Sequence, residues 1–169
     1  MGDNLKVDLH LHTTASDGTW GPEKLVSKIK NAGIGLFAVT DHDSTENLTE
    51  VAGQARELDL GFIKGVEINT SYQQRNYHIL GLGVDPANHE LQALLTMNRQ
   101  LMEEKDDESI RYLEGKYPGV SFSEYQVYMN HRERGGWKAF NYLMDKQLCN
   151  SHQDFFRLFD GWGNPFEKL

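Results

Sequence analysis

The chain has 169 residues, of which 38% are hydrophobic and 25% charged, so it can bury the core of one ordinary globular domain. Its 17 basic and 25 acidic side chains give a formal net charge of −8, which excludes an overall basic surface for nucleic acid. The single Cys149 excludes an intramolecular disulfide and favours a reducing, cytoplasmic location. No apolar stretch approaches the roughly 18 residues of a membrane span, and no signal-peptide pattern opens the chain.

The first half of the chain alternates strand and helix patterns. Runs typical of strands are Lys6–His12, Gly35–Thr40, Phe62–Ile68 and Tyr77–Val84. Between them, a helix is expected from Pro22 to the Gly33 stop, and a second helix is expected after Ser44, which can cap it. Such repeating units predict a parallel sheet or barrel. The last two runs lie too close together for a parallel crossover, so we expect a hairpin around Ser71–Asn76.

The second half of the chain has helical patterns only. Asn88 can cap a long helix that breaks at Tyr117–Gly119, and its charged tract Asp106–Glu108 is expected to face solvent. Short helices are then expected at Ser123–Asn130, Trp137–Leu148 and Ser151–Phe159. The sequence therefore predicts an α/β part, residues 1–87, followed by a helical subdomain, residues 88–169.

Histidines and a carboxylate surround the end of the first strand. His10 and His12 are two residues apart on a strand, so both rings project to one face and can chelate a divalent metal. A His-x-His pair alone is equally well explained as two surface or core histidines. Asp17 follows in the next loop, where Asp-Gly is also a turn signal. Beside the two histidines, we favour a ligand role for Asp17.

The next two strands bring further donors to the same edge. His42 follows the second strand directly, and ligands in α/β folds collect beyond the carboxyl ends of strands. Its neighbour Asp41 can ligate or orient an imidazole, whereas Asp43 and Ser44 can be explained as helix caps, an explanation that we favour for Ser44. Glu67 is the only carboxylate in its apolar run, and burying it is costly unless it is paired or metal-bound. In the hairpin, His78 opens the fourth strand beside the end of the third.

Six donors without a thiolate are thus expected to cluster. They are His10, His12, Asp17, His42, Glu67 and His78. Nitrogen and oxygen ligands suit a cluster of Mn²⁺, Fe or Zn²⁺ better than a structural zinc site. Clustered ions can polarise a phosphoryl oxygen and generate hydroxide, so the set predicts hydrolysis of a phosphate ester, with His10, His12 and Glu67 as the central catalytic group.

The order and spacing of these motifs resemble the opening motifs of the PHP (polymerase and histidinol phosphatase) family. The matching segments are Asp8-Leu-His-Leu-His-Thr, Ser16-Asp-Gly, Val39-Thr-Asp-His-Asp, Gly65-Val-Glu and His78-Ile-Leu-Gly. The resemblance covers the first half of the chain and implies a distorted (β/α)₇ barrel with a trinuclear metal centre and phosphoesterase activity. It further implies three metals. The first is held by His10 and His12, and Glu67 bridges it to a second metal held with His78. The third metal is held by Asp17 and His42. Asp41 is then a group outside the ligand shell.

The same resemblance implies later ligands that this sequence lacks. Family members continue with another His on a later strand and an Asp-x-His motif, and no Asp-x-His follows residue 84. Barrels of this kind typically need about 200 residues or more. We therefore expect a partial barrel with a helical insertion subdomain. A truncated chain, a degraded species, a split protein and a half-barrel that pairs with another chain all remain open, and self-association is expected of an exposed half-barrel.

A basic and aromatic patch lies in the predicted helical subdomain. Arg134 and Lys138 can meet a substrate phosphate, and Trp137 can stack on a base or lie in the local core. The resemblance to the nucleotide-acting branch favours a nucleotide mono- or bisphosphate or a short oligonucleotide as substrate. The alternative function is that of a catalytically incomplete metal-binding or interaction domain, which the absent later ligands favour.

Overall fold

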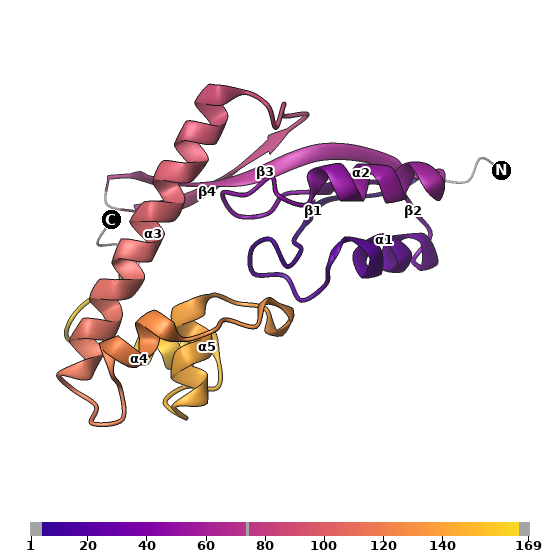
Figure 1. The fold of residues 1–169 in the computed structure, drawn as a ribbon. Helices are drawn as coiled ribbons and strands as arrows, with labels where there is room; N and C mark the ends of the chain where they lie inside the picture. The colour runs from indigo at the N-terminus through magenta and orange to yellow at the C-terminus, as the bar shows by residue number, and fades with distance from the viewer. Residues whose placement is uncertain (1–4, 74, 166–169) are drawn as a thin grey trace.

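The computed structural model describes residues 5–73 and 75–165, and its first part is a four-stranded sheet with two helices (Figure 1). The elements are β1 (Lys6–Leu11), α1 (Pro22–Asn31), β2 (Ile34–Val39), α2 (Leu48–Glu57), β3 (Gly61–Tyr72) and β4 (Arg75–Leu82). The strands are ordered β1-β2-β3-β4, and β2 pairs in parallel with both β1 and β3. The carboxyl ends of these three strands therefore point the same way and gather the loops that carry polar side chains.

The predicted hairpin is confirmed, because β4 pairs antiparallel with β3. Its strands are longer than the apolar runs indicated, since Asn69 pairs with His78 and Tyr72 with Arg75. Glu67 and His78 consequently lie inside β3 and β4 and not at strand ends. The polar residues after Ile68 show no apolar alternation, and it is the ladder with β4 that keeps them extended.

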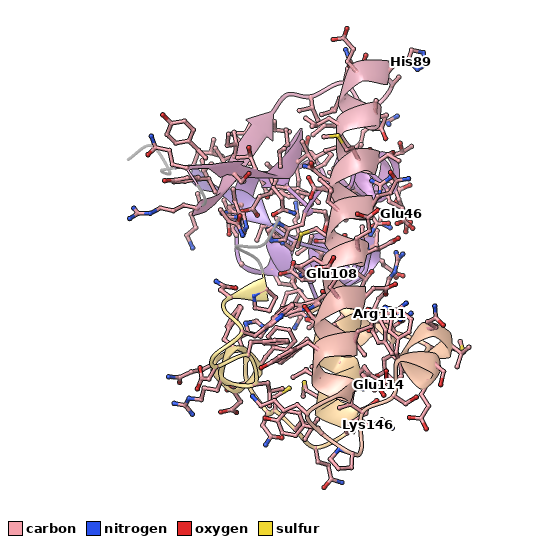
Figure 2. The ribbon with its side chains drawn as sticks, turned by 90° about the vertical axis from the view of Figure 1, so that its left-hand side faces the viewer. Glu46, His89, Glu108, Arg111, Glu114 and Lys146 are labelled. Carbon is pink, nitrogen blue, oxygen red and sulfur yellow. The ribbon has the colours of Figure 1, made fainter. Side chains whose placement is uncertain are left out.

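The second part contains helices joined by loops, and no strand among its described residues. Its elements are α3 (His89–Glu114), α4 (Phe122–Val127), the 3₁₀ turn η1 (Arg132–Arg134), α5 (Lys138–Asp145) and α6 (His152–Arg157). Asn88 caps α3 as predicted, since its Oδ1 accepts a hydrogen bond from the Leu91 N–H at 2.8 Å. The long helix α3 runs from beside the β3–β4 hairpin to the helices of the second part (Figures 1 and 2). None of the described helices is both long and apolar enough to span a membrane.

Two hydrophobic clusters stabilise the two parts. One lies between the sheet and α1 and α2, around Val26, Phe37 and Val51. The other lies among α3 to α6 and is rich in aromatic rings, including Phe155 and Phe159. Each cluster forms because apolar residues recur along its helices and strands at the spacing that puts them on one face.

Two expectations about polar residues are wrong. Ser44 does not cap α2, because Asn47 precedes that helix, and the Ser44 Oγ instead accepts from the Glu46 N–H at 3.3 Å. Asp106 does not face solvent, because α5 packs over this turn of α3 and buries it beside Lys105, whereas Glu108 is exposed. Burial of the acidic tract thus depends on a neighbouring helix that the charge pattern does not reveal.

Candidate metal centre

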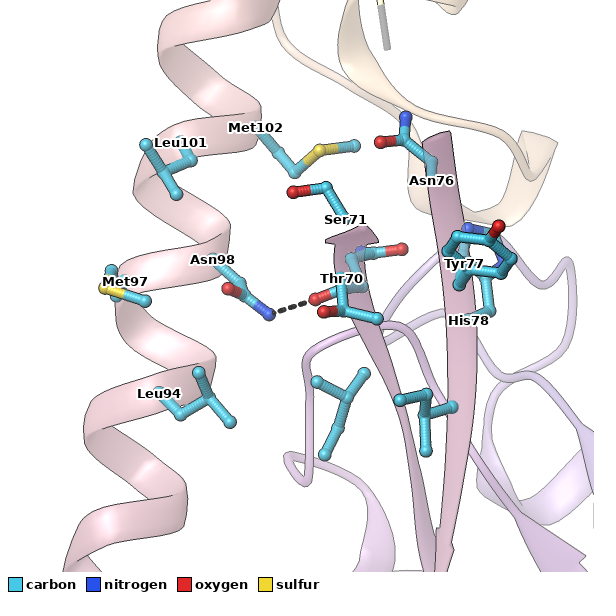
Figure 3. Close-up of a pocket in the computed structure, with 13 residues that line it drawn as sticks. Thr70, Ser71, Asn76, Tyr77, His78, Leu94, Met97, Asn98, Leu101 and Met102 are labelled. Carbon is cyan, nitrogen blue, oxygen red and sulfur yellow. Dashed lines mark hydrogen bonds between the residues drawn. The ribbon is translucent and has the colours of Figure 1, made fainter. Parts of the chain in front are cut away.

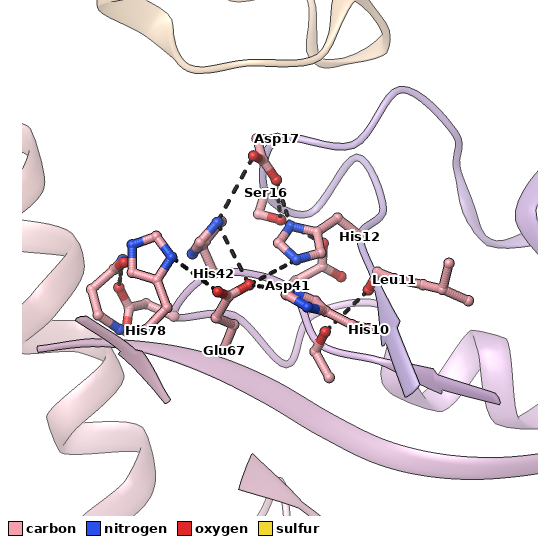
Figure 4. Close-up of polar contacts among 12 residues, drawn as sticks. His10, Leu11, His12, Ser16, Asp17, Asp41, His42, Glu67 and His78 are labelled. Atoms are coloured by element: carbon pink, nitrogen blue, oxygen red, sulfur yellow. Dashed lines mark hydrogen bonds and ion pairs between the residues drawn. The ribbon is translucent and has the colours of Figure 1, made fainter. Parts of the chain in front are cut away.

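The two histidines of the first strand converge on one carboxylate. His10 lies in β1 and His12 just after it, so the two-residue period of the strand places both rings on one side. The Nε2 atoms of both rings lie 2.8 Å from Oε2 of Glu67, as Figure 4 shows. The buried Glu67 reaches them from β3, two strands away in the sheet.

A tight loop brings Asp17 to the same place. The N–H groups of Ser16 and Gly18 both donate to the Thr13 carbonyl, at 3.2 and 3.0 Å. Gly18 is required here, because a Cβ at this position would lie 2.5 Å from the His12 carbonyl oxygen. The turn sets Oδ1 of Asp17 2.6 Å from Nδ1 of His12.

Asp41 holds this loop and does not contact the imidazoles. Its buried carboxylate accepts from the Thr13 N–H at 2.7 Å and from the Thr13 hydroxyl at 2.7 Å. The Ser16 hydroxyl donates to it at 2.6 Å. Asp41 therefore acts on the loop that carries Asp17, whereas the sequence left open a direct ligand or an imidazole-orienting role.

His42 faces two carboxylates across a gap. A parallel bridge joins its backbone to that of Glu67, which sets His42 at the shared strand edge. Its Nε2 lies 3.8 Å from Oδ2 of Asp17 and 3.7 Å from Oε2 of Glu67, too far for hydrogen bonds. Its buried Nδ1 has no hydrogen-bond partner among the described residues.

The two oxygens of Glu67 serve different histidines. Oε2 faces His10 and His12, whereas Oε1 lies 2.9 Å from Nδ1 of His78 in the paired strand β4. The side chains of His10 and His78 are 52% and 50% exposed, so the centre is open on both sides of the buried carboxylate. Such a carboxylate can bridge two cations, one on each oxygen.

The charges of the centre favour ionised carboxylates. Burial alone raises the pKa of Asp17, but the hydrogen bond with His12 and the nearby imidazole charges outweigh it and lower the pKa to about 2. Burial is likewise outweighed at Glu67, where the hydrogen bond with His10 helps to lower the pKa. Burial lowers the pKa of His42, whereas at His12 burial is outweighed by the bond to Asp17 together with the charges of the nearby carboxylates, and the pKa is raised. The centre thus offers two anions and a neutral His42 to a cation.

The donors form three overlapping groups whose ligand atoms lie within 4.8 Å of one another. Among the described residues these groups are His10–His12–Glu67, His12–Asp17–His42 and His42–Glu67–His78. Ligands on one such ion lie about 3 Å apart, because metal–ligand bonds are about 2.1 Å long. Two observations therefore fit a cluster of divalent ions. The donors are nitrogen and oxygen atoms, and Nε2 of His42 lies 3.8 and 3.7 Å from the two carboxylates.

The predicted phosphate-binding side chains lie in the helical part. Nη1 of Arg134 lies 2.8 Å from Oδ1 of Asp145, and Nζ of Lys138 donates to the Gln126 carbonyl at 3.2 Å. Trp137 packs against Phe140 and Phe155, with ring centroids 5.1 and 5.0 Å apart, so it lies in the local aromatic core. None of these contacts joins the three side chains to the imidazole centre.

The backbone of the same segment does reach the centre. The N–H of Gly136 donates to the Asp17 carbonyl at 3.0 Å. Arg132, at the start of the segment, lies 3.1 Å from Glu46 in the loop that follows β2. The helical part therefore contacts two loops of the α/β part close to the candidate ligands.

Comparison with known protein families identifies the family of this chain. The PHP domain family matches residues 8–152, most of the chain. The chain belongs to the PHP domain family. This PHP domain also resembles a solved amidohydrolase from Chromobacterium violaceum with bound sulfate and no metal, at 30% identity and a TM-score of 0.75 over 90% of this chain and 54% of that chain. The expected fold, a partial distorted PHP barrel with an α/β start and a helical addition, is confirmed.

Two curated relatives match the PHP domain at similar identity. The 5'-3' exoribonuclease of Haemophilus influenzae is 38% identical over 100 residues, which cover 59% of this chain and 36% of the relative. The 3',5'-nucleoside bisphosphate phosphatase of Chromobacterium violaceum is 38% identical over 94 residues, which cover 56% and 33%. The chain spans about a third of the length of these relatives.

Sequence reasoning missed a network behind the centre. Asp43, explained as a helix cap, is buried and accepts hydrogen bonds from Asn69 and Asn98. Arg99 donates to its carbonyl. Asn98 and Arg99 lie on α3, more than 50 residues along the chain, and their residue types carry no signal of this contact.

Proposed function

We propose that this PHP domain carries the metal centre of a phosphoesterase. The observation that carries the proposal is the buried Glu67 carboxylate, which faces imidazoles with both oxygens and has Nε2 of His42 3.7 Å from Oε2. Glu67 has no ion pair with a lysine or arginine within residues 5–73 and 75–165, and such a carboxylate is costly to bury unless cations neutralise it. Up to three divalent ions, Mn²⁺, Fe or Zn²⁺, suit these donors.

Each side chain of the centre has a distinct task in this proposal. His10 and His12 would hold one ion, His78 a second and Asp17 with His42 a third, and Glu67 would bridge the first two. Bound ions of this kind polarise a phosphoryl oxygen and lower the pKa of a coordinated water. Asp41 keeps the Asp17 loop in place through Thr13 and Ser16.

Nucleotide phosphates are the proposed substrates. One relative is named a nucleoside bisphosphate phosphatase and another an exoribonuclease, which supports a nucleotide mono- or bisphosphate or a short oligonucleotide. Arg134 and Lys138 stay candidates for phosphate contact, and Arg134 would exchange Asp145 for the substrate. The net charge of −8 disfavours a long polyanion.

We also propose that further polypeptide, from a longer chain or a second one, completes the barrel. A groove of about 460 Å³ lies between α3 and the β3–β4 hairpin, with Leu94, Met97 and Ile79 among its lining residues (Figure 3). These three apolar side chains are exposed, and such a patch favours association. Light scattering after size-exclusion chromatography tests this, since a clean monomer that does not bind a hydrophobic dye contradicts it.

The domain division and the cellular location also stay predictions. The division into residues 1–87 and 88–169 is one, and separate expression of the two pieces tests it. The other is the cytoplasmic location, which the buried, unpaired Cys149 favours.

Metal content and turnover test the function together. We expect two or three ions per chain by elemental analysis and hydrolysis of a generic phosphate ester with added Mn²⁺. Both should be lost in His10→Ala and Glu67→Ala. Substoichiometric metal and no turnover would support the alternative, an incomplete metal-binding or interaction domain.

A further inference from the structure

Asp43 joins α3 to the loop that carries His42. It follows His42 directly and is buried, with a φ of +44° that is uncommon for a residue other than glycine. Its Oδ1 accepts from Nδ2 of Asn98 at 2.8 Å and from the Asn69 N–H at 3.2 Å. Its Oδ2 accepts from the side-chain amide of Asn69. The carboxylate therefore ties the loop to β3 and to α3 at once.

The backbone of Asp43 is held from the same two sides. Its N–H donates to the Glu67 carbonyl at 2.9 Å, and Nη1 of Arg99 donates to its carbonyl at 2.6 Å. Nδ2 of Asn98 also donates to the Asn69 carbonyl at 2.8 Å. A left-handed conformation persists only where its surroundings hold it, and α3 supplies two of these hydrogen bonds.

His42 depends on this backbone for its position. A metal-binding imidazole usually has its second nitrogen held by a carboxylate, carbonyl or water. The buried Nδ1 of His42 has no such partner within the described residues, and its Nε2 makes no hydrogen bond to Asp17 or Glu67. Its ring packs edge-on against the rings of His12 and His78, at centroid distances of 4.7 Å, and the peptide that joins His42 to Asp43 fixes the backbone from which the ring projects.

The helical part also holds Asp17, another member of the His12–Asp17–His42 group, through two glycines. Gly135 and Gly136 have φ values of +73° and +67°, and the Gly136 N–H donates to the Asp17 carbonyl at 3.0 Å. A Cβ at Gly135 would lie 3.0 Å from that carbonyl oxygen and 2.8 Å from Cγ2 of Thr19. Asn141 of α5 donates to the Gly135 carbonyl at 2.9 Å and secures the turn. Close approach to Asp17 thus requires this pair of glycines.

We propose that the helical part positions the His12–Asp17–His42 group and so sets the affinity of the centre for one metal ion. Asn98 and Arg99 are positioning residues that act through Asp43 on His42, and Gly136 acts on Asp17. In contrast, His10 and Glu67 of the other group lie within β1 and β3 of the sheet. The inference rests on the proposed metal centre and adds the part of the chain that tunes one of its ions.

Mn²⁺ titration of Asn98→Ala tests the proposal in the full chain. We expect one ion per chain to be lost or to bind at least about 10-fold more weakly, as for other changes behind a metal ligand, while the remaining ions keep their affinity. Gln92→Ala is the matched control, because Gln92 also joins α3 to this loop, at Thr45, but does not contact Asp43. It should bind Mn²⁺ as the unchanged chain does.

Thermal unfolding separates positioning from folding. The rise in Tm that Mn²⁺ produces should shrink in Asn98→Ala relative to its own metal-free protein, whatever the metal-free Tm is. Arg99→Met repeats the test without a buried cavity, and Arg99→Lys should restore part of the Mn²⁺ affinity.

Three outcomes overturn the inference. Unchanged Mn²⁺ stoichiometry and affinity in both Asn98→Ala and Arg99→Met would do so while the proposed phosphoesterase stands. Equal weakening of all bound ions would also do so, because it would show a general loss of structure. An unchanged chain that binds no Mn²⁺ would overturn the proposed metal centre and this inference together.

Discussion

In the α/β part, three carboxylates are buried without an ion pair to any described lysine or arginine, those of Asp41 and Asp43 in the loop after β2 and that of Glu67 within β3. In the helical part, the buried charges are Lys105 and Asp106, whose Nζ and Oδ1 lie 2.8 Å apart beside an aromatic core. In the proposed metal centre, Glu67 is neutralised by cations from outside the chain, whereas the helical part neutralises its buried charges internally. The difference indicates that ion uptake and stability are separable in this molecule.

Glu67→Gln is expected to have the largest effect. Because this carboxylate faces three histidines, we expect Mn²⁺ affinity and phosphate-ester hydrolysis to fall by more than the roughly 100-fold seen for changes outside a ligand shell. Glutamine keeps the volume and an acceptor, so the free energy of unfolding of the metal-free protein should change by about 1 kcal/mol or less. Titration and urea unfolding measure the two quantities, and unchanged Mn²⁺ uptake would contradict the comparison.

Phe155→Ala in the helical part should instead lower the free energy of unfolding and leave Mn²⁺ affinity unchanged. Phe155 is fully buried in the aromatic cluster, and truncation of such a ring costs about 3–5 kcal/mol. Its neighbour Phe156 is 38% exposed, so Phe156→Ala is a matched control that should cost about 1 kcal/mol or less. Equal losses in urea unfolding would show that this cluster does not stabilise the part.

Lys105→Met tests the internal ion pair. Burial lowers the pKa of Lys105 and raises that of Asp106, so each charge depends on the other. Removal of one partner of a buried pair costs about 3 kcal/mol or more, and joint replacement by Lys105→Met and Asp106→Leu should recover part of it. Urea unfolding of the single and double variants measures this. A double variant less stable than the single one would argue that Asp106 has a further role at α5.

Low pH should reduce the stability of the metal-free α/β part, because its carboxylates become protonated. The pKa of Asp17 in the folded chain, about 2, lies below its ordinary 3.8, and that of Glu67 is also lowered, so their stabilisation is complete above pH 5 and is lost as the pH falls toward 2. Asp17 is 41% exposed, so solvent screening limits its share to about 1 kcal/mol. Unfolding of the metal-free chain as a function of pH measures the slope, which Asp17→Asn should reduce.

Much of the centre could be predicted from the sequence. The alternation at His10 and His12 fixes which face they share, and the apolar run before His42 places it at a strand end. The short interval before His78 required a hairpin, which the structure confirms. The length of the hairpin could not be predicted, because residues 69–72 are kept extended by pairing with β4 and not by their own pattern.

The sequence by itself determined the donor types, the strands and the helices, because side-chain period and caps act between residues a few positions apart. Only the tertiary structure decided that Asn98 of α3 meets Asp43, that Gly136 meets Asp17, and that α5 buries Asp106. These contacts join residues 33 to 119 positions apart, and packing of whole elements, not local pattern, selects them. Short sequence motifs thus supply the donors of the centre. The helices that hold these donors in place carry no local sequence signal of the contacts they make.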